Sequence, residues 1–229
     1  DLHYPLRRQR QMCIRDSCEE EEDFSTPFYV DENGVTIKAK DWVTVGTTGV
    51  LNGITYMAID DSLISISDFK SKYPEITELK QLVTTLVTDM SNYGGGYMLI
   101  YEFDDFKSIE TWDVSNVTSM AGLFNTCNCF NPAYVNVENM PNLTYWDVSS
   151  VTDMSAMFSH IYGGAMFNQD ISGWDVSNVT NMYRMFMGSN QFNQDLSSWD
   201  VSKVTNCDQF SDWTGEWTLP QPNFPISCN

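Results

Sequence analysis

The chain has 229 residues, 31 acidic and 12 basic, which gives a formal net charge of −19 at pH 7. A negative field of this size repels nucleic-acid phosphates and anionic membrane surfaces, so neither is expected as a partner. Hydrophobic residues make up 42% of the chain, enough to build a core, and no apolar run is long enough to predict a membrane span.

The first 23 residues differ in character from the rest of the chain. The arginine-rich stretch from Arg7 to Ser17 resembles a translated adapter sequence, and the run from Glu19 to Asp23 is acidic throughout. Runs of like charge without hydrophobic periodicity are typical of disordered segments. We therefore expect residues 1–23 to form a disordered tail that is partly non-native; the alternative for its basic part is a targeting signal.

Residues 24–78 are expected to form a small β-rich N-terminal cap. Asn52-Gly53 predicts a two-residue hairpin turn. A short helix is expected to begin near Asp68 and to be interrupted by Pro74. The segments with strand composition are 35–37, 42–45 and 54–59.

A nine-residue motif of the form Trp-Asp-Val-Ser-x-Val-Thr-x-Met recurs four times. The copies begin at Trp112, Trp146, Trp174 and Trp199, and a weaker copy lies between Leu79 and Met90. The spacing between copies is unequal, which indicates insertions in loops between equivalent units. Units this short cannot bury their own aromatic side chains, so neighbouring units must stack.

Each copy predicts a short strand followed by a short helix. Trp-x-Val alternates with period two, which places both side chains on one face of a strand and the intervening Asp on the other. Ser177 has the position of an N-cap for the helix of the third copy. The apolar residues with helical spacing in that copy are Val179, Met182, Met185 and Phe186.

An Ile or Leu three residues before each Trp completes a frame with the spacing of leucine-rich repeats. The predicted fold class is therefore α/β: a right-handed leucine-rich-repeat-type solenoid with a parallel sheet of short strands, plus the β-rich N-terminal cap. Its four to five coils are expected within residues 79–206. Residues 207–229, where the repeat fades, are expected to form a C-terminal cap.

The full pattern continues with Met-Phe and then Phe-Asn-Gln-Asp before the next Ile/Leu-Ser-x-Trp. It resembles the BspA-like leucine-rich-repeat surface proteins, including the repeat surface lipoproteins of mycoplasmas. The resemblance covers residues 79–229 and departs from the pattern at 93–106 and 125–142. It implies an exported or surface-attached protein, often assigned to adhesion, and it brings no catalytic residues.

The aspartates between Trp and Val form the candidate ligand-binding site. Stacked in register they would make a row of like charges, which destabilises a sheet unless something offsets the repulsion. The offset could come from hydrogen bonds with the following serines, from a bound cation such as Ca²⁺, or from a cationic ligand group. No metal ligands are assigned, and calcium is the one cofactor considered. The row consists of Asp113, Asp147, Asp175 and Asp200; Asp170 and Asp195 are expected to cap turns instead.

Cys207 and Cys228 bracket the C-terminal cap and are expected to form a disulfide in an oxidising compartment. The pairing of Cys127 and Cys129 stays open, because a metal site would need further ligands that the nearby sequence does not supply.

The sequence predicts no enzyme. It has two histidines, His3 and His160, and it lacks a nucleophile turn and a phosphate-binding glycine loop. We expect a secreted or cell-surface repeat protein that mediates adhesion, binding an extracellular protein or glycan through its strand face. The alternative is a structural spacer or surface-layer component without a specific ligand.

Overall fold

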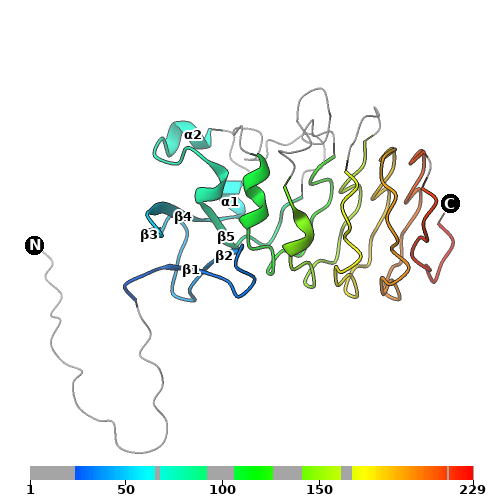
Figure 1. Cartoon of the computed structure of the whole chain (residues 1–229), viewed down its shortest axis with the longest axis horizontal. Coiled ribbons are helices and arrows are strands. Elements are labelled where there is room, and N and C mark those ends of the chain that lie inside the picture. The colour runs from blue at the N-terminus through cyan, green and yellow to red at the C-terminus, as the bar shows by residue number, and fades with distance from the viewer. Residues whose placement is uncertain are drawn as a thin grey trace, which may run out of the picture.

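The structure is a computed structural model of the chain. Strands and short helices gather towards the N-terminal end, and successive turns of the chain lie side by side towards the C-terminus (Figure 1). The predicted tail, residues 1–23, lies outside the described residues, as do Cys127 and Cys129. The structure describes residues 24–64, 68–91, 106–125, 141–160, 167–215 and 217–228.

Two small sheets form before the repeats. In the first, β1 (Phe28–Val30) pairs antiparallel with β2 (Ile37–Ala39). In the second, β4 (Ile54–Asp60) lies between an antiparallel β3 (Thr48–Leu51) and a parallel β5 (Leu82–Leu86). The strand β5 belongs to the weak copy of the motif, so this sheet joins the N-terminal block to the repeats.

The turn chemistry of this block follows the sequence closely. Asn52 and Gly53 join β3 to β4 with φ of 52° and 80°, the left-handed backbone that a two-residue hairpin needs, so the hairpin prediction is confirmed. Helix α2 (Phe69–Lys72) begins directly after Asp68 and ends at Lys72. The next residue, Tyr73, precedes Pro74, whose ring disfavours helical backbone in the residue before it.

The remaining helices of the described residues are short, from three to six residues. They are α1 (Asp61–Ile64) and the 3₁₀ segments η1 (Leu79–Gln81), η3 (Phe106–Thr111) and η6 (Leu143–Tyr145). No helix among the described residues is long and apolar enough to cross a membrane.

The predicted fold class, an α/β right-handed leucine-rich-repeat-type solenoid with a parallel sheet of short strands, is wrong. Among the described residues from 106 onwards there is no strand and no α-helix; most of this backbone consists of turns and irregular segments. Within the described ranges the only sheets have two and three strands, and both end before residue 87. Trp and Val of each motif are buried as predicted for a strand, but the backbone between them pairs with no neighbour as a strand.

Backbone conformation explains why no helix follows the motif. The residue two positions after each Met (Cys207 in the last copy) has a positive φ, for example 55° at Arg184. A left-handed residue cannot continue a right-handed helix, so the helical spacing of Met182, Met185 and Phe186 arises from tight turns instead. The equivalent positions are Gly122, Ala156 and Gln209, with φ of 64°, 52° and 56°.

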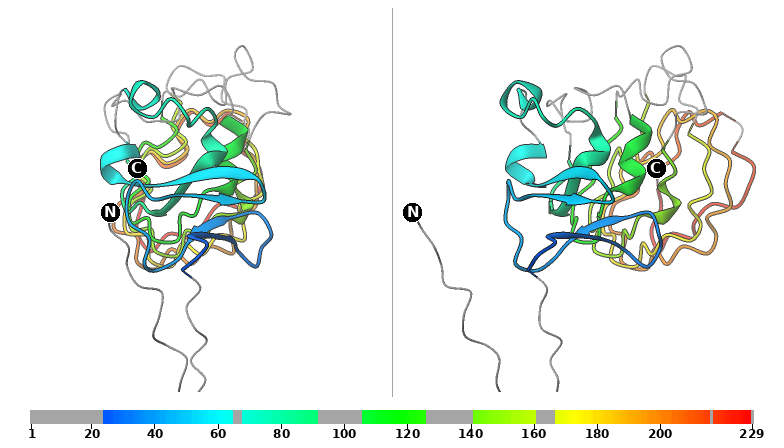
Figure 2. Two further views of the ribbon diagram at one scale, coloured as in Figure 1. Left: turned by 90° about the vertical axis from the view of Figure 1, so that its left-hand side faces the viewer. Right: turned by 60° about the vertical axis from the view of Figure 1, so that its left-hand side comes forward.

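Each repeat contacts the next through one parallel bridge and several further backbone hydrogen bonds, such as Ala156 N to Tyr183 O at 2.7 Å. The bridged residues sit between Thr and Met of the motif, in the order Asp89, Ser119, Asp153, Asn181 and Asn206. Beside them runs a threonine ladder: Thr152 donates from its backbone N to Thr118 O at 2.8 Å and from its hydroxyl to the same oxygen at 3.1 Å. Thr118, Thr180 and Thr205 repeat both bonds. Seen end-on, the turns lie over one another (Figure 2).

The motif tryptophans link neighbouring units through hydrogen bonds inside the core. Each buried indole N–H donates to a backbone carbonyl of the preceding unit, as in Trp174 Nε1 to Leu143 O at 3.1 Å. Trp112, Trp146 and Trp199 make the same bond to Leu79, Ile109 and Ile171. Leucine would fill the space but would leave these buried carbonyls without a donor, which explains the choice of Trp.

A continuous apolar core runs from Met57 to Phe210, so the N-terminal block and the repeats share it. Its centre is a column of stacked rings in which Phe158 lies 5.5 Å from both Phe124 and Phe186, centroid to centroid. A second, smaller cluster packs around Phe28 and Tyr56.

The C-terminal segment closes the last repeat. Trp217 Nε1 donates to Gln194 O at 2.9 Å, and Leu196 N donates to Pro220 O at 2.9 Å. A disulfide joins Cys207 to Cys228, with the two Cα atoms 4.9 Å apart. The segment is thus held across the end of the stack.

Candidate functional site

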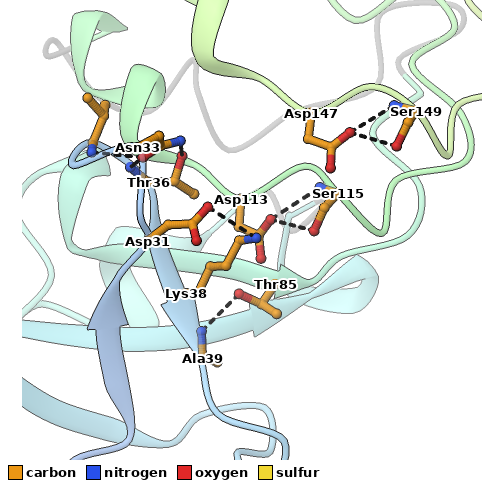
Figure 3. A network of polar contacts seen from close by, with 11 residues as sticks. Asp31, Asn33, Thr36, Lys38, Ala39, Thr85, Asp113, Ser115, Asp147 and Ser149 are labelled. Atoms are coloured by element: carbon orange, nitrogen blue, oxygen red, sulfur yellow. Dashed lines mark hydrogen bonds and ion pairs between the residues drawn. The ribbon is translucent and has the colours of Figure 1, made fainter. Parts of the chain in front are cut away.

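Each aspartate of the predicted row accepts a hydrogen bond from the serine two residues later. Asp147 Oδ1 accepts from Ser149 N at 3.1 Å and from Ser149 Oγ at 2.7 Å (Figure 3). Asp113 makes the same pair of bonds with Ser115. We call these residues the Asp–Ser face: Asp113, Asp147, Asp175 and Asp200 with Ser115, Ser149, Ser177 and Ser202.

Hydrogen bonding lowers the pKa of two aspartates of the face, Asp175 and Asp200. The hydroxyl and then the backbone N–H of Ser177 lower the pKa of Asp175, against a smaller opposing effect from the charge of Asp200. Ser202 lowers the pKa of Asp200 in the same way. Of the three ways to offset the repulsion, hydrogen bonds from serine are the one seen here.

Asp170 and Asp195 form a second set of the same turns. Asp195 Oδ1 accepts from Ser197 N at 3.0 Å and from Ser197 Oγ at 2.6 Å, and Asp170 accepts from Ser172 N at 3.0 Å. Both aspartates have a lowered pKa because of the serine hydrogen bonds. They cap turns, as the sequence predicted, and they provide an internal comparison for the Asp–Ser face.

One member of the face is covered by the chain itself. Asp113 is only 2% exposed, whereas Asp147, Asp175 and Asp200 are exposed. The cover is β2: Ala39 N donates to Thr85 Oγ1 at 3.0 Å, and Lys38 Nζ lies 3.3 Å from Asp31 Oδ2 with Asp113 beside it (Figure 3).

Lys38 supplies positive charge where Asp113 is buried. Burial alone would lower the pKa of Lys38, but the charges of Asp113 and Asp31 and the hydrogen bond to Asp31 raise it overall. Asp113 Oδ2 is buried and accepts no hydrogen bond. A buried carboxylate oxygen without a donor is costly unless a cation lies near, so Lys38 makes this burial tolerable.

The remaining candidates of the described residues concern metal binding and His160. Among the described residues, no three side chains of His, Cys, Asp or Glu are grouped so that they could hold a metal ion. His160 is buried, its backbone N donates to Met187 O, and its ring Nδ1 lies 3.3 Å from Phe158 O. His3 lies outside the described residues.

Two sets of connecting residues were not predicted. In the Phe-Asn-Gln-Asp segments, Asn193 N donates to Asn168 Oδ1 at 2.8 Å, and Gln194 Nε2 donates to Asn168 O at 2.9 Å. The recurrence of Asn-Gln before Asp was the available signal. In the weak copy, Thr88 has no preceding repeat to which it could donate. Its backbone N and its Oγ1 donate instead to the Asp61 carboxylate, at 2.7 Å and 2.6 Å.

Comparisons with known proteins give one family. No curated protein and no solved structure matches the chain significantly. A family model matches it twice, over residues 65–140 and over residues 131–215, so that the matches together cover more than half of the chain. The chain therefore belongs to the family described as Mycoplasma protein of unknown function, DUF285.

Proposed function

We propose that the chain is a secreted or cell-surface protein that mediates adhesion by binding a protein partner through the exposed part of the Asp–Ser face. The observation that carries this proposal is the contrast within one row. Asp113 is buried under β2, whereas Asp147, Asp175 and Asp200 present the same Asp-x-Ser turn to solvent. The covered unit provides an example of how the exposed units would be engaged.

The proposed location rests on three observations. The motif resembles that of BspA-like surface proteins, the matching family is described from mycoplasmas, and the stack ends in the Cys207–Cys228 disulfide. Structural disulfides persist in oxidising surroundings such as the cell exterior.

Binding suits this face better than catalysis does. A general acid or base works best with a pKa near the operating pH. The pKa values of Asp175 and Asp200 are shifted the other way, below the ordinary value, because serine donates to both carboxylates. Such groups are fixed hydrogen-bond acceptors and permanent charges, which serve recognition.

A triple variant tests the proposal: Asp147→Asn, Asp175→Asn and Asp200→Asn together. Asparagine keeps an oxygen that accepts from serine, so the turns should persist while the charge is lost. The matched control is Asp170→Asn with Asp195→Asn, which changes the same type of turn outside the face.

The measurement is saturable binding to a panel of immobilised extracellular proteins, with a glycan array in parallel. We expect one or more proteins to bind the wild type and the control equally and the triple variant more weakly. Binding to glycans alone would contradict a protein partner. The absence of saturable binding, or equal binding by both variants, would favour a structural spacer.

A further inference from the structure

We infer that the exposed units of the Asp–Ser face take lysine or arginine side chains from an extended protein segment, docked as β2 docks on the first unit. The inference rests on the proposed function and specifies its ligand class. It is carried by three observations: the contacts of β2, the aspartate oxygens of the exposed units to which serine does not donate, and the buried Asp113 oxygen.

The first observation is how β2 lies on the stack. Aligned on Met90 and Met120, Thr85 of the weak copy occupies the place of Ser115. Ala39 donates its backbone N–H to the Thr85 hydroxyl at 3.0 Å, while Lys38 brings its charge to Asp113. An extended segment thus places one backbone N–H on the hydroxyl of the weak copy, at the position of the motif serine. The same segment places one ammonium group near the motif aspartate of the next unit.

The second observation is that each exposed aspartate has one oxygen to which its serine does not donate. Ser149 Oγ gives its only hydrogen to Asp147 Oδ1, at 2.7 Å, which leaves the serine oxygen able only to accept. The serine bonds to the three exposed aspartates all end on Oδ1, which leaves Oδ2 for a ligand. Charged donors in a planar or tripod arrangement are what such a surface binds best.

The third observation shows what covering a unit requires. Asp113 Oδ2 is buried without a hydrogen-bond donor, and the nearby cation is Lys38. Covering Asp147 with a neutral or acidic segment would bury a carboxylate without compensation, at a cost comparable to that of an unpaired buried charge. The face therefore selects for cationic segments and against others.

The geometry indicates how basic residues in the ligand should be spaced. Bridged units lie about 4.8 Å apart, and alternate residues of an extended chain lie about 6.8 Å apart on one face. Flexible lysine stems span this difference. Lys203 already lowers the pKa of Asp175 and Asp200 slightly, so Asp147 is expected to contribute most to binding.

The probe is a synthetic peptide that alternates lysine and threonine, with an otherwise identical peptide of acetylated lysines as its control. Affinity is measured by titration calorimetry at low and raised salt. A surface ion pair contributes little by itself, so we expect Asp147→Asn to weaken binding about threefold and the triple variant about tenfold or more. The Asp170→Asn/Asp195→Asn control should bind as the wild type does.

Three outcomes would overturn the inference. Equal weakening in the control pair would mean that the peptide senses only the general acidity of the chain. Equal affinity for the acetylated peptide would mean that the face needs no cation. A failure of the lysine peptide to bind would remove the ligand class. The last two outcomes leave the proposed function intact if a protein of the panel still depends on the three aspartates.

A second measurement, made without any ligand, tests whether Lys38 compensates the buried charge of Asp113. Lys38→Gln should lower the urea midpoint of the wild type more than it lowers that of an Asp113→Asn variant, because the cation is needed only when the carboxylate is charged. Equal shifts in the two backgrounds would show that Lys38 acts through Asp31 alone and would overturn the inference.

Discussion

The N-terminal block and the repeats are built on different principles. In the block, backbone ladders carry the pairing: β4 bonds to β3 on one side and to β5 on the other. In the repeats, backbone hydrogen bonds between units, such as Phe158 N to Met185 O at 2.9 Å, are joined by side chains that donate to backbone oxygens, from tryptophan, threonine and serine. Side-chain bonds require fixed residue types at fixed positions, which is why the repeats keep a strict motif and the block has none.

The two principles meet at β5. On one side this strand pairs with β4, and on the other Thr84 Oγ1 donates to Asp113 O at 2.9 Å while Thr85 O accepts from Asn116 Nδ2 at 2.8 Å. The weak copy of the motif thus has a strand of the block on one side and the first full repeat on the other.

The largest expected effect is in the ring column of the repeats. Phe158→Ala removes a fully buried side chain that contacts rings of both neighbouring units, so we expect the free energy of unfolding to fall by about 3–5 kcal/mol. Phe28→Ala, in the smaller cluster of the block, is the comparison and should cost less. Urea denaturation measures both. A larger loss at Phe28 would place the main source of stability in the block.

The next effect concerns the end of the stack. Cys228→Ser removes the disulfide to Cys207, which closes a short loop across the last unit, and should cost about 3 kcal/mol by the chain-entropy estimate. Thermal melts with and without reductant measure it. Reductant should lower the midpoint of the wild type to that of the variant and leave the variant unchanged. A further fall in the variant would reveal a second stabilising disulfide.

A pair of tryptophans compares the two regions directly. Trp174→Phe leaves the buried Leu143 carbonyl without its indole donor, so we expect a loss of about 1–3 kcal/mol. The indole N–H of Trp42, in the N-terminal block, is buried and has no acceptor. Trp42→Phe removes an unpaired donor and should therefore cost less than Trp174→Phe. Equal losses by chemical denaturation would mean that ring volume, and not the hydrogen bond, explains the motif tryptophans.

The sequence predicted the unit of repetition better than its conformation. The alternation of Trp146, Asp147 and Val148 correctly predicts which side chains are buried, yet an extended segment between turns produces the same alternation as a strand. The left-handed residues that exclude the helix are Ala156, Arg184 and Gln209, types that rarely adopt such backbone. Among these positions only Gly122, in the first copy, is of a residue type that predicts a left-handed turn. Asn52-Gly53, in contrast, predicts its hairpin because both residues favour positive φ.

The candidate site was partly predictable for a similar reason. The Asp-x-Ser turns are local, so the motif itself places serine within reach of Asp175 and Asp200. The electrostatic interaction of Lys38 with Asp113 depends on how β2 packs against β5, which no local pattern encodes. The feature on which the proposed ligand class rests thus comes from tertiary structure.

The smallest expected effect is a pH dependence that arises from the Asp-x-Ser turns of the repeats. The pKa values of Asp170, Asp175, Asp195 and Asp200 are lowered in the folded chain because serine donates to each carboxylate. A folded pKa below the unfolded one adds stability at higher pH. That stability is fully present above the unfolded pKa, about 3.9, and is lost as the pH falls through the folded pKa.

The melting temperature, recorded from neutral to strongly acidic pH, should therefore decrease once the pH is below about 4, where these aspartates gain protons. Replacing all four by asparagine removes their titration while keeping an acceptor for serine, and should flatten the fall. Asp61 is the corresponding group of the N-terminal block: burial opposes ionisation there, but hydrogen bonds from Thr88 and Asp89 lower its pKa overall. If the fourfold variant keeps the full acid dependence and Asp61→Asn removes it, acid sensitivity belongs to the block and its junction, and the turns of the repeats contribute only geometry.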